Sequence, residues 1–137
     1  MSKANINVST RGNASKLHKT INKLLREIYP YNIIQQEMPV KVKPEGMRQR
    51  TLYFDFVVRE LDMYIECQGR QHFEKVGFYH QDGGFERQKQ NDQLKRDWCK
   101  SNGYIMVELP YHEDYNKDLL YQYIDKAIAD AMENEDE

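Results

Sequence analysis

Two carboxylates, those of Asp55 and Glu66, lie inside apolar stretches of the sequence. Asp55 has a phenylalanine on each side, and Glu66 stands between Ile65 and Cys67. A carboxylate in such surroundings costs free energy unless it is paired or binds a metal ion. Both stretches have the pattern of strands and a short connection joins them, so we expect a hairpin that brings the two acids side by side. Their oxygen ligands would suit Mg²⁺ or Mn²⁺.

A simpler interpretation of these acids stays open on spacing alone. One acid could pair with an Arg or a Lys while the other stands at a strand end. Strand alternation places Asp55 on the same face as Tyr53 and Val57, opposite Phe54 and Phe56. The metal interpretation therefore needs support from the residues that follow.

The stretch after the second acid resembles one group of nucleases. The chain carries, in order, Asp55, Glu66-Cys67-Gln68-Gly69, Gln71-His72-Phe73, Asn91-Asp92, and Gly103-Tyr104 before a strand. This order is similar to the very-short-patch-repair-like branch of the PD-(D/E)XK superfamily. That branch includes phage homing endonucleases described by an E-D-x-H-D pattern. The resemblance covers about residues 14–110.

The resemblance implies a restriction-endonuclease-like core and a Mg²⁺- or Mn²⁺-dependent DNA endonuclease or nickase. In that family pattern Asp55 would be the central metal ligand and Glu66 would take the second acidic position. The carbonyl of Cys67 would be the backbone ligand beside them. His72 would be the general base or the donor to the transition state, because an imidazole exchanges a proton near neutral pH.

The sequence departs from the superfamily at Gln68, which stands where a Lys is usual. Relatives in this branch also lack the Lys, and the resemblance implies that His72 replaces it. The resemblance further implies that Glu27 and Asp92 orient His72 or bind water at the metal.

Charge is distributed unevenly along the chain, whose net charge is −2. Residues 1–100 carry 18 Lys and Arg against 12 Asp and Glu, whereas residues 101–137 carry 2 against 10. A positive body suits a protein that meets a polyanion with one face. The basic groups expected to contact DNA phosphates, or else to be ordinary solvated side chains, are Lys43, Arg48, Arg50, Arg70, Lys95 and Arg96.

The elements that must position these groups follow from hydrophobic periodicity. We expect a helix from Asn13 to Pro30, extended segments over 33–42, 52–58 and 63–67, a helix over 84–102 ended by Gly103, a strand over 104–109 and a helix over 113–132. This order predicts an α/β domain with a mixed sheet flanked by helices. The single nuclease-like domain would span 13–132, between a flexible N-terminus (1–12) and an acidic tail (133–137).

The remaining features set the context. Cys67 and Cys99 are expected to be free thiols in a reducing cytoplasm, that of a bacterial host if the protein is phage-encoded. No apolar run approaches a membrane span, so no membrane partner is expected. His18, His80 and His112 are interpreted as surface residues. DNA is the expected partner, and a homodimer would supply two centres for a double-strand break. The alternatives are a catalytically silent nuclease-fold module that binds DNA or a protein, and a nuclease that cuts RNA.

Overall fold

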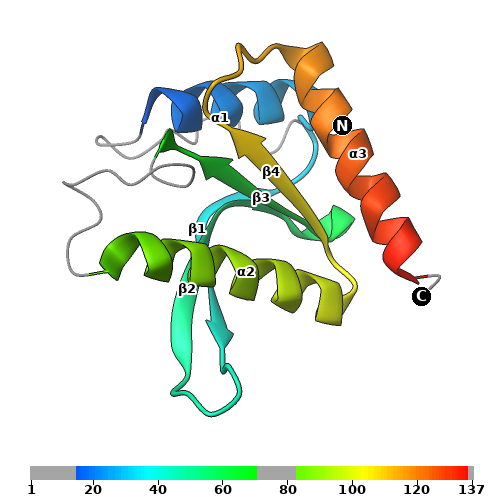
Figure 1. Ribbon diagram of the computed structural model, residues 1–137. Helices are drawn as coiled ribbons and strands as arrows, with labels where there is room; N and C mark the ends of the chain where they lie inside the picture. The colour runs from blue at the N-terminus through cyan, green and yellow to red at the C-terminus, as the bar shows by residue number, and fades with distance from the viewer. Residues whose placement is uncertain (1–14, 71–82, 136–137) are drawn as a thin grey trace.

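The computed structural model describes residues 15–70 and 83–135 (Figure 1). Four strands form one sheet in the order β1-β2-β3-β4, and their bounds are β1 (Ile34–Val42), β2 (Arg50–Val58), β3 (Met63–Gln68) and β4 (Ile105–Pro110). The β1–β2 and β2–β3 pairs are antiparallel, and β4 runs parallel to β3. The parallel pair needs a crossover, which the segment containing the second helix provides.

Three helices flank the sheet, namely α1 (Lys16–Ile28), α2 (Gly84–Asn102) and α3 (Lys117–Glu135), and a single 3₁₀ turn, η1 (Arg59–Leu61), joins β2 to β3. The predicted α/β class, with a mixed sheet flanked by helices, is confirmed. The last helix begins later than expected and continues to Glu135, so the first residues of the predicted acidic tail are helical.

Two hydrophobic clusters lie on opposite sides of the sheet. The larger one joins α1 and α3 to the sheet through residues such as Leu25, Ile65 and Leu120. The smaller one packs α2 against the sheet, with Cys99 buried and Trp98 against the rings of Phe54, Tyr64 and Tyr104. The sheet is therefore covered by helices on both faces. A charged side chain on β3 lies beneath a helix whichever face it points to.

Local signals explain where the helices begin and end. Ser15 caps α1, because its hydroxyl accepts the His18 N–H at 3.1 Å. Gly103 ends α2 with a φ of 71°, and its N–H bonds to carbonyls of the last helical turn, as the sequence predicts. The chain then enters β4 in a register that sets Glu66 opposite Glu108.

The β1–β2 hairpin extends beyond the rest of the sheet (Figure 1). Its strands remain paired out to Val42 and Arg50, and the connecting residues include Gly46 at a φ of 74°. Among the helices that the structure describes, none has both the length and the apolar character that crossing a membrane requires.

Candidate functional site

The site is built where β2 and β3 separate. Their main-chain pairing runs from Val58–Met63 to Phe56–Ile65 and stops before the two acids. Beyond that point, side-chain carboxylates bond to the main-chain N–H groups in place of the ladder. Glu66 Oε1 accepts the Asp55 N–H at 3.1 Å, and Asp55 Oδ2 accepts the Cys67 N–H at 2.8 Å. The hairpin thus makes the two acids neighbours along the strands, as the sequence predicts, but their side chains turn to opposite faces of the sheet: Asp55 toward His18 of α1 and Glu66 toward Lys95 of α2.

Asp55 also marks a break in the regular alternation of β2. Phe54 belongs to the cluster beneath α2, whereas Phe56 belongs to the cluster beneath α1 and α3. The prediction that these two rings share a face is therefore wrong. The β1–β2 ladder keeps its register on both sides of the break but omits Glu37 and Asp55. Glu37 adopts a φ of 53°, which is uncommon for a residue with a side chain and concentrates at functional sites.

Glu66 leaves β3 on the α2 side and meets Lys95. The Lys95 Nζ lies 2.7 Å from Glu66 Oε2, and the two side chains are only 10% and 5% exposed. Burial, the largest influence, raises the pKa of the Glu66 carboxyl; Lys95 lowers it and the Asp55 charge raises it, and the net pKa is above the ordinary value. Lys95, expected to contact DNA phosphates, instead supplies a buried cation beside the acids.

His18 is the residue that the sequence interpretation missed most clearly. It was expected at the surface, but it is 3% exposed in the first turn of α1. Its Nδ1 lies 3.5 Å from Asp55 Oδ1, its Nε2 lies 3.0 Å from Gln36 Oε1, and its ring lies 4.4 Å from that of Phe56. Burial lowers the pKa of His18, but the bonds to Asp55 and Gln36 and the Asp55 charge outweigh it, so the pKa is raised.

Cys67 completes a cluster of three different ligand types. In the described part of the chain, one ligand atom each of His18, Asp55 and Cys67 lie within 4.8 Å of one another. The family pattern assigns a metal to the Cys67 carbonyl, whereas here its thiol joins the cluster. Burial first, and then the charges of Asp55, Glu66 and Glu37, hold the pKa of this thiol well above its ordinary value.

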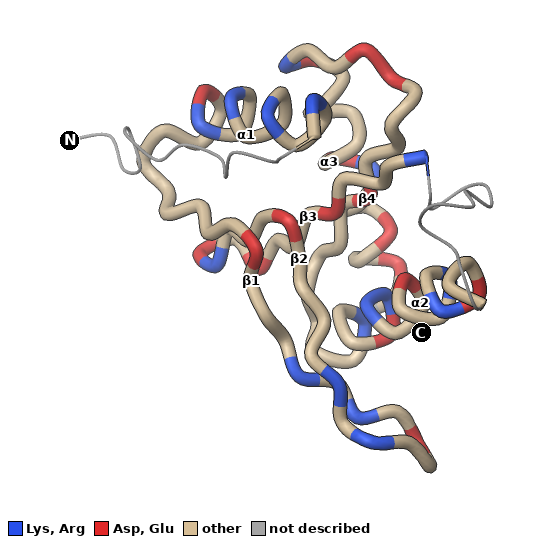
Figure 2. Tube along the Cα trace, turned by 90° about the vertical axis from the view of Figure 1, so that its left-hand side faces the viewer, with Lys and Arg blue, Asp and Glu red and all other residues tan. Residues whose placement is uncertain are grey.

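Glu37 is a further acid that sequence reasoning did not select. It lies in β1 between Gln36 and Met38, which pair with Phe56 and Phe54, and its charge contributes to the raised pKa of His18 and to that of Cys67. A signal was present, since Glu37 stands inside a predicted strand as Asp55 does. In Figure 2 acidic positions on neighbouring strands lie close together across the sheet.

Gln68 lies on the same side of β3 as Glu66 and points toward β4. Its Nε2 donates to Glu108 Oε1 at 2.5 Å. The guanidinium of Arg96 also donates to Glu108, with Nη2 at 2.7 Å from Oε1. Arg96, predicted to contact DNA, is therefore held in an ion pair with Glu108 on the edge strand β4.

The other predicted acids differ in position. Asp92 faces inward on α2, one turn from Lys95, and accepts the Gln88 Nε2 at 3.1 Å. Glu27 lies 3.7 Å from Lys117. It is nine residues beyond His18, about 13 Å along the helix axis at 1.5 Å per residue. The described contacts therefore do not bring Glu27 to Asp55. His72, with the Gln71-His72-Phe73 motif around it, falls outside the described residues.

The remaining residues that were predicted to contact phosphates differ in exposure and in their contacts. Lys43 and Arg48 are exposed on the connection of the β1–β2 hairpin, where Figure 2 shows basic positions gathered. Arg50, at the base of that connection, donates to Asn91 Oδ1 of α2 at 2.9 Å. Arg70 is exposed directly after β3. The end of the β1–β2 hairpin is thus positively charged, and it extends past α2, beyond the rest of the sheet (Figure 1).

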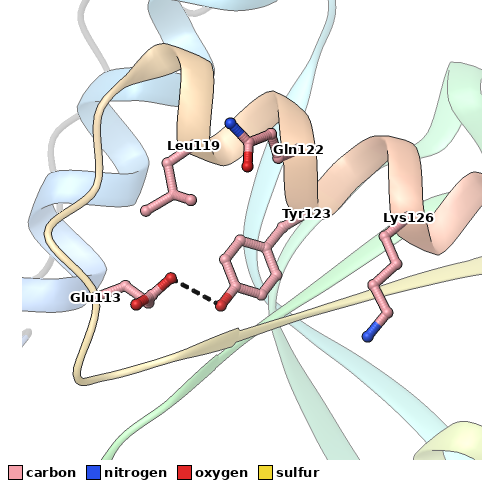
Figure 3. Close-up of a pocket in the computed structure, with 5 residues that line it drawn as sticks. All are labelled: Glu113, Leu119, Gln122, Tyr123 and Lys126. Carbon is pink, nitrogen blue, oxygen red and sulfur yellow. Dashed lines mark hydrogen bonds between the residues drawn. The ribbon is translucent and has the colours of Figure 1, made fainter.

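A hollow at α3 is unrelated to this site. It is lined by Glu113, Leu119, Gln122, Tyr123 and Lys126 (Figure 3). The Tyr123 hydroxyl donates to Glu113 Oε2 at 3.0 Å, which ties the β4–α3 connection to the helix. The hollow shares no lining residue with the cluster around Asp55. We therefore assign the Tyr123–Glu113 contact a structural role.

Comparison with known proteins adds one relative. No protein-family model matches the chain, and no solved structure matches it. Uncharacterized protein 094L of Frog virus 3 (isolate Goorha) is similar to it, with 38% identity over 64 residues. That stretch is 45% of this chain and 41% of the viral protein, so the chain matches less than half of its relative's length. Any functional argument therefore rests on the site's geometry.

Proposed function

We propose that the chain is a metal-dependent nuclease that hydrolyses DNA phosphodiester bonds, with its centre at Asp55, Glu66 and Lys95. The observation that carries the proposal is the buried Lys95–Glu66 pair of 2.7 Å beside Asp55, at the point where β2 and β3 separate. The arrangement matches the chemistry of the predicted nuclease core, with the cation supplied from α2 rather than from position 68.

The donor set suits a hard divalent cation. Asp55 and Glu66 offer carboxylate oxygens, with Glu66 buried and Asp55 partly exposed. Mg²⁺ and Mn²⁺ prefer such oxygen ligands. Asp55, whose side chain is 23% exposed, would hold the ion, and Glu66 would share it by turning from the α2 side of the sheet. The ion would supply Lewis-acid polarisation of the scissile phosphate and a water that ionises more readily.

The chain's own residues supply the remaining chemistry. Lys95 places a fixed ammonium beside the acids, where it would stabilise charge that develops on the phosphate oxygens. His18 holds Asp55 Oδ1 from the α1 side, while the Cys67 N–H holds Oδ2. These two contacts fix the carboxylate's orientation, so His18 is a positioning residue in this account.

DNA binding is assigned to the β1–β2 hairpin. A two-stranded ribbon fits the major groove, and Lys43 and Arg48 on its connection would contact phosphates. These contacts give affinity without sequence specificity, so the proposal commits to DNA as a class and to no particular site.

One observation favours the second candidate, a catalytically silent module that binds DNA or a protein. Lys95 already neutralises Glu66, and Gln68 replaces the usual Lys. In a silent module this ion pair would be purely structural.

Cleavage of supercoiled plasmid separates the two candidates. The parent protein is incubated with plasmid, or with a labelled RNA of matched length, in Mg²⁺, Mn²⁺ or EDTA. We expect nicked or linear DNA with either ion and none with EDTA. Lys95→Arg keeps a buried cation and should retain part of the rate, whereas Lys95→Met should lose it. A parent that binds DNA but cuts nothing with either ion would establish the silent module, and cutting of RNA alone would overturn the DNA assignment.

A further inference from the structure

The cluster of His18, Asp55 and Cys67 combines nitrogen, oxygen and sulfur ligands from α1, β2 and β3. We propose that these three side chains form a binding site for a thiophilic divalent ion such as Zn²⁺. Two of the ligands, the His18 nitrogen and the Cys67 sulfur, differ in kind from the oxygen donors of the proposed hydrolytic centre. Imidazole, carboxylate and thiolate are the three side-chain ligands that zinc uses in proteins.

The spacing of the ligand atoms fits tetrahedral coordination. Ligands about 2.0–2.3 Å from a tetrahedral zinc ion lie roughly 3.3–3.8 Å from one another. The His18 Nδ1 to Asp55 Oδ1 distance is already 3.5 Å. All three ligand atoms lie within 4.8 Å of one another, so side-chain adjustments of about 1 Å complete the site.

The groups around the cluster already orient two of its ligands. Gln36 Oε1 lies 3.0 Å from His18 Nε2; a proton on Nε2 leaves the Nδ1 lone pair directed toward Asp55. The Cys67 N–H donates to Asp55 Oδ2, so Oδ1, the oxygen nearer His18, remains available as a metal ligand. Such partners behind the ligands fix ring orientation and commonly contribute 10–100-fold to metal affinity.

Electrostatics also favours a dication here. Asp55 lies in the cluster and Glu66 accepts its main-chain N–H, so two acidic groups that repel one another are close to the cluster. A divalent ion offsets that repulsion, and the thiol releases its proton to solvent on binding. Three protein ligands leave a fourth position open for water.

The site shares Asp55 with the proposed hydrolytic centre. Zn²⁺ held by His18 and Cys67 would therefore compete with Mg²⁺ for that carboxylate and inhibit cleavage. This consequence rests on the proposed function, whereas the binding site itself does not.

Cobalt spectroscopy tests the binding site without any cleavage assay. The full chain, free of a histidine tag and kept reduced, is titrated with Co²⁺ and then with Zn²⁺. We expect a thiolate-to-cobalt charge-transfer band with intense visible bands of tetrahedral Co²⁺, and displacement of both by Zn²⁺. Cys67→Ser should remove the charge-transfer band, and Gln36→Ala should weaken Zn²⁺ binding by about 10–100-fold.

Cys99→Ala is the matched control, because Cys99 is a free thiol buried on the other side of the sheet. It should keep the full spectrum. A parent without the charge-transfer band, a band that persists in Cys67→Ser, or a band lost in folded Cys99→Ala would overturn the proposal. His18→Gln provides a second ligand variant if Cys67→Ser does not fold, and it should lose the tetrahedral bands. If Zn²⁺ binds and the parent cuts no DNA, only the nuclease proposal fails.

Discussion

Replacing Lys95 with Met should destabilise the protein far more than most single substitutions on a helix. The change leaves the Glu66 carboxylate, 5% exposed, without its 2.7 Å cation. Removing one partner of a buried ion pair typically costs about 3–5 kcal/mol, because the remaining charge is desolvated and uncompensated. A domain of this size has a total unfolding free energy of roughly 5–15 kcal/mol. The loss is therefore a large share of the whole.

Urea unfolding, followed by circular dichroism with EDTA present, measures this loss. With a slope of about 2 kcal/mol per molar urea, the midpoint should fall by about 1.5–2.5 M. Glu66→Gln combined with Lys95→Met removes both charges and should recover more than half of the stability. A double variant no more stable than Lys95→Met would refute the reasoning.

Arg96→Met is the matched control on the next residue of the same helix. Its ion pair with Glu108 joins side chains that are 42% and 29% exposed. Exposed pairs contribute about 0–1 kcal/mol, so the midpoint should move by less than about 0.5 M. Equal effects of Lys95→Met and Arg96→Met would contradict the burial argument.

Further predictions concern the charge of His18 and the hairpin. In metal-free buffer, NMR titration should give His18 a pKa above 6.5, and Asp55→Asn should lower that pKa, because burial opposes the charged ring and the bond and charge of Asp55 help to outweigh it. The contribution of protonated His18 to the free energy of unfolding is complete below pH 6.5 and is lost as the pH rises through the raised pKa of the folded state. The difference in unfolding free energy between the parent and Asp55→Asn should therefore shrink as the pH rises above 6.5. A difference that stays constant over this pH range would contradict the prediction. Lys43→Ala with Arg48→Ala should reduce the slope of log affinity for duplex DNA against log salt by about 2, whereas Lys126→Ala on α3 should leave it unchanged.

The sequence predicts the element order and the adjacency of the two strand acids. Periodicity and local signals carry that information, as at Gly103, where the need for a positive φ ends α2. That Asp55 and Glu66 are neighbours follows from two strands and a tight connection, whereas the turn of their side chains to opposite faces does not. These features depend on residues close together in the chain.

Contacts between distant elements were not predictable in the same way. His18 stands on the buried stripe of α1 with Ile21, Asn22 and Leu25, but no local pattern indicates that its ring meets Asp55. The reach of Lys95 from α2 to β3 likewise depends on tertiary packing. The alternation rule failed at Asp55 because it assumes a regular strand, whereas β2 changes its buried side there.

Plasmid cleavage by parent and Asp55→Asn, purified identically, tests the nuclease proposal most directly. Asn keeps the size of the side chain and removes the charge that would hold the metal ion. The account predicts that the parent nicks supercoiled DNA with Mg²⁺, that Asp55→Asn does not, and that both bind the DNA equally in Ca²⁺. Equal cleavage by the two proteins would place the activity outside the Asp55 site and contradict the account.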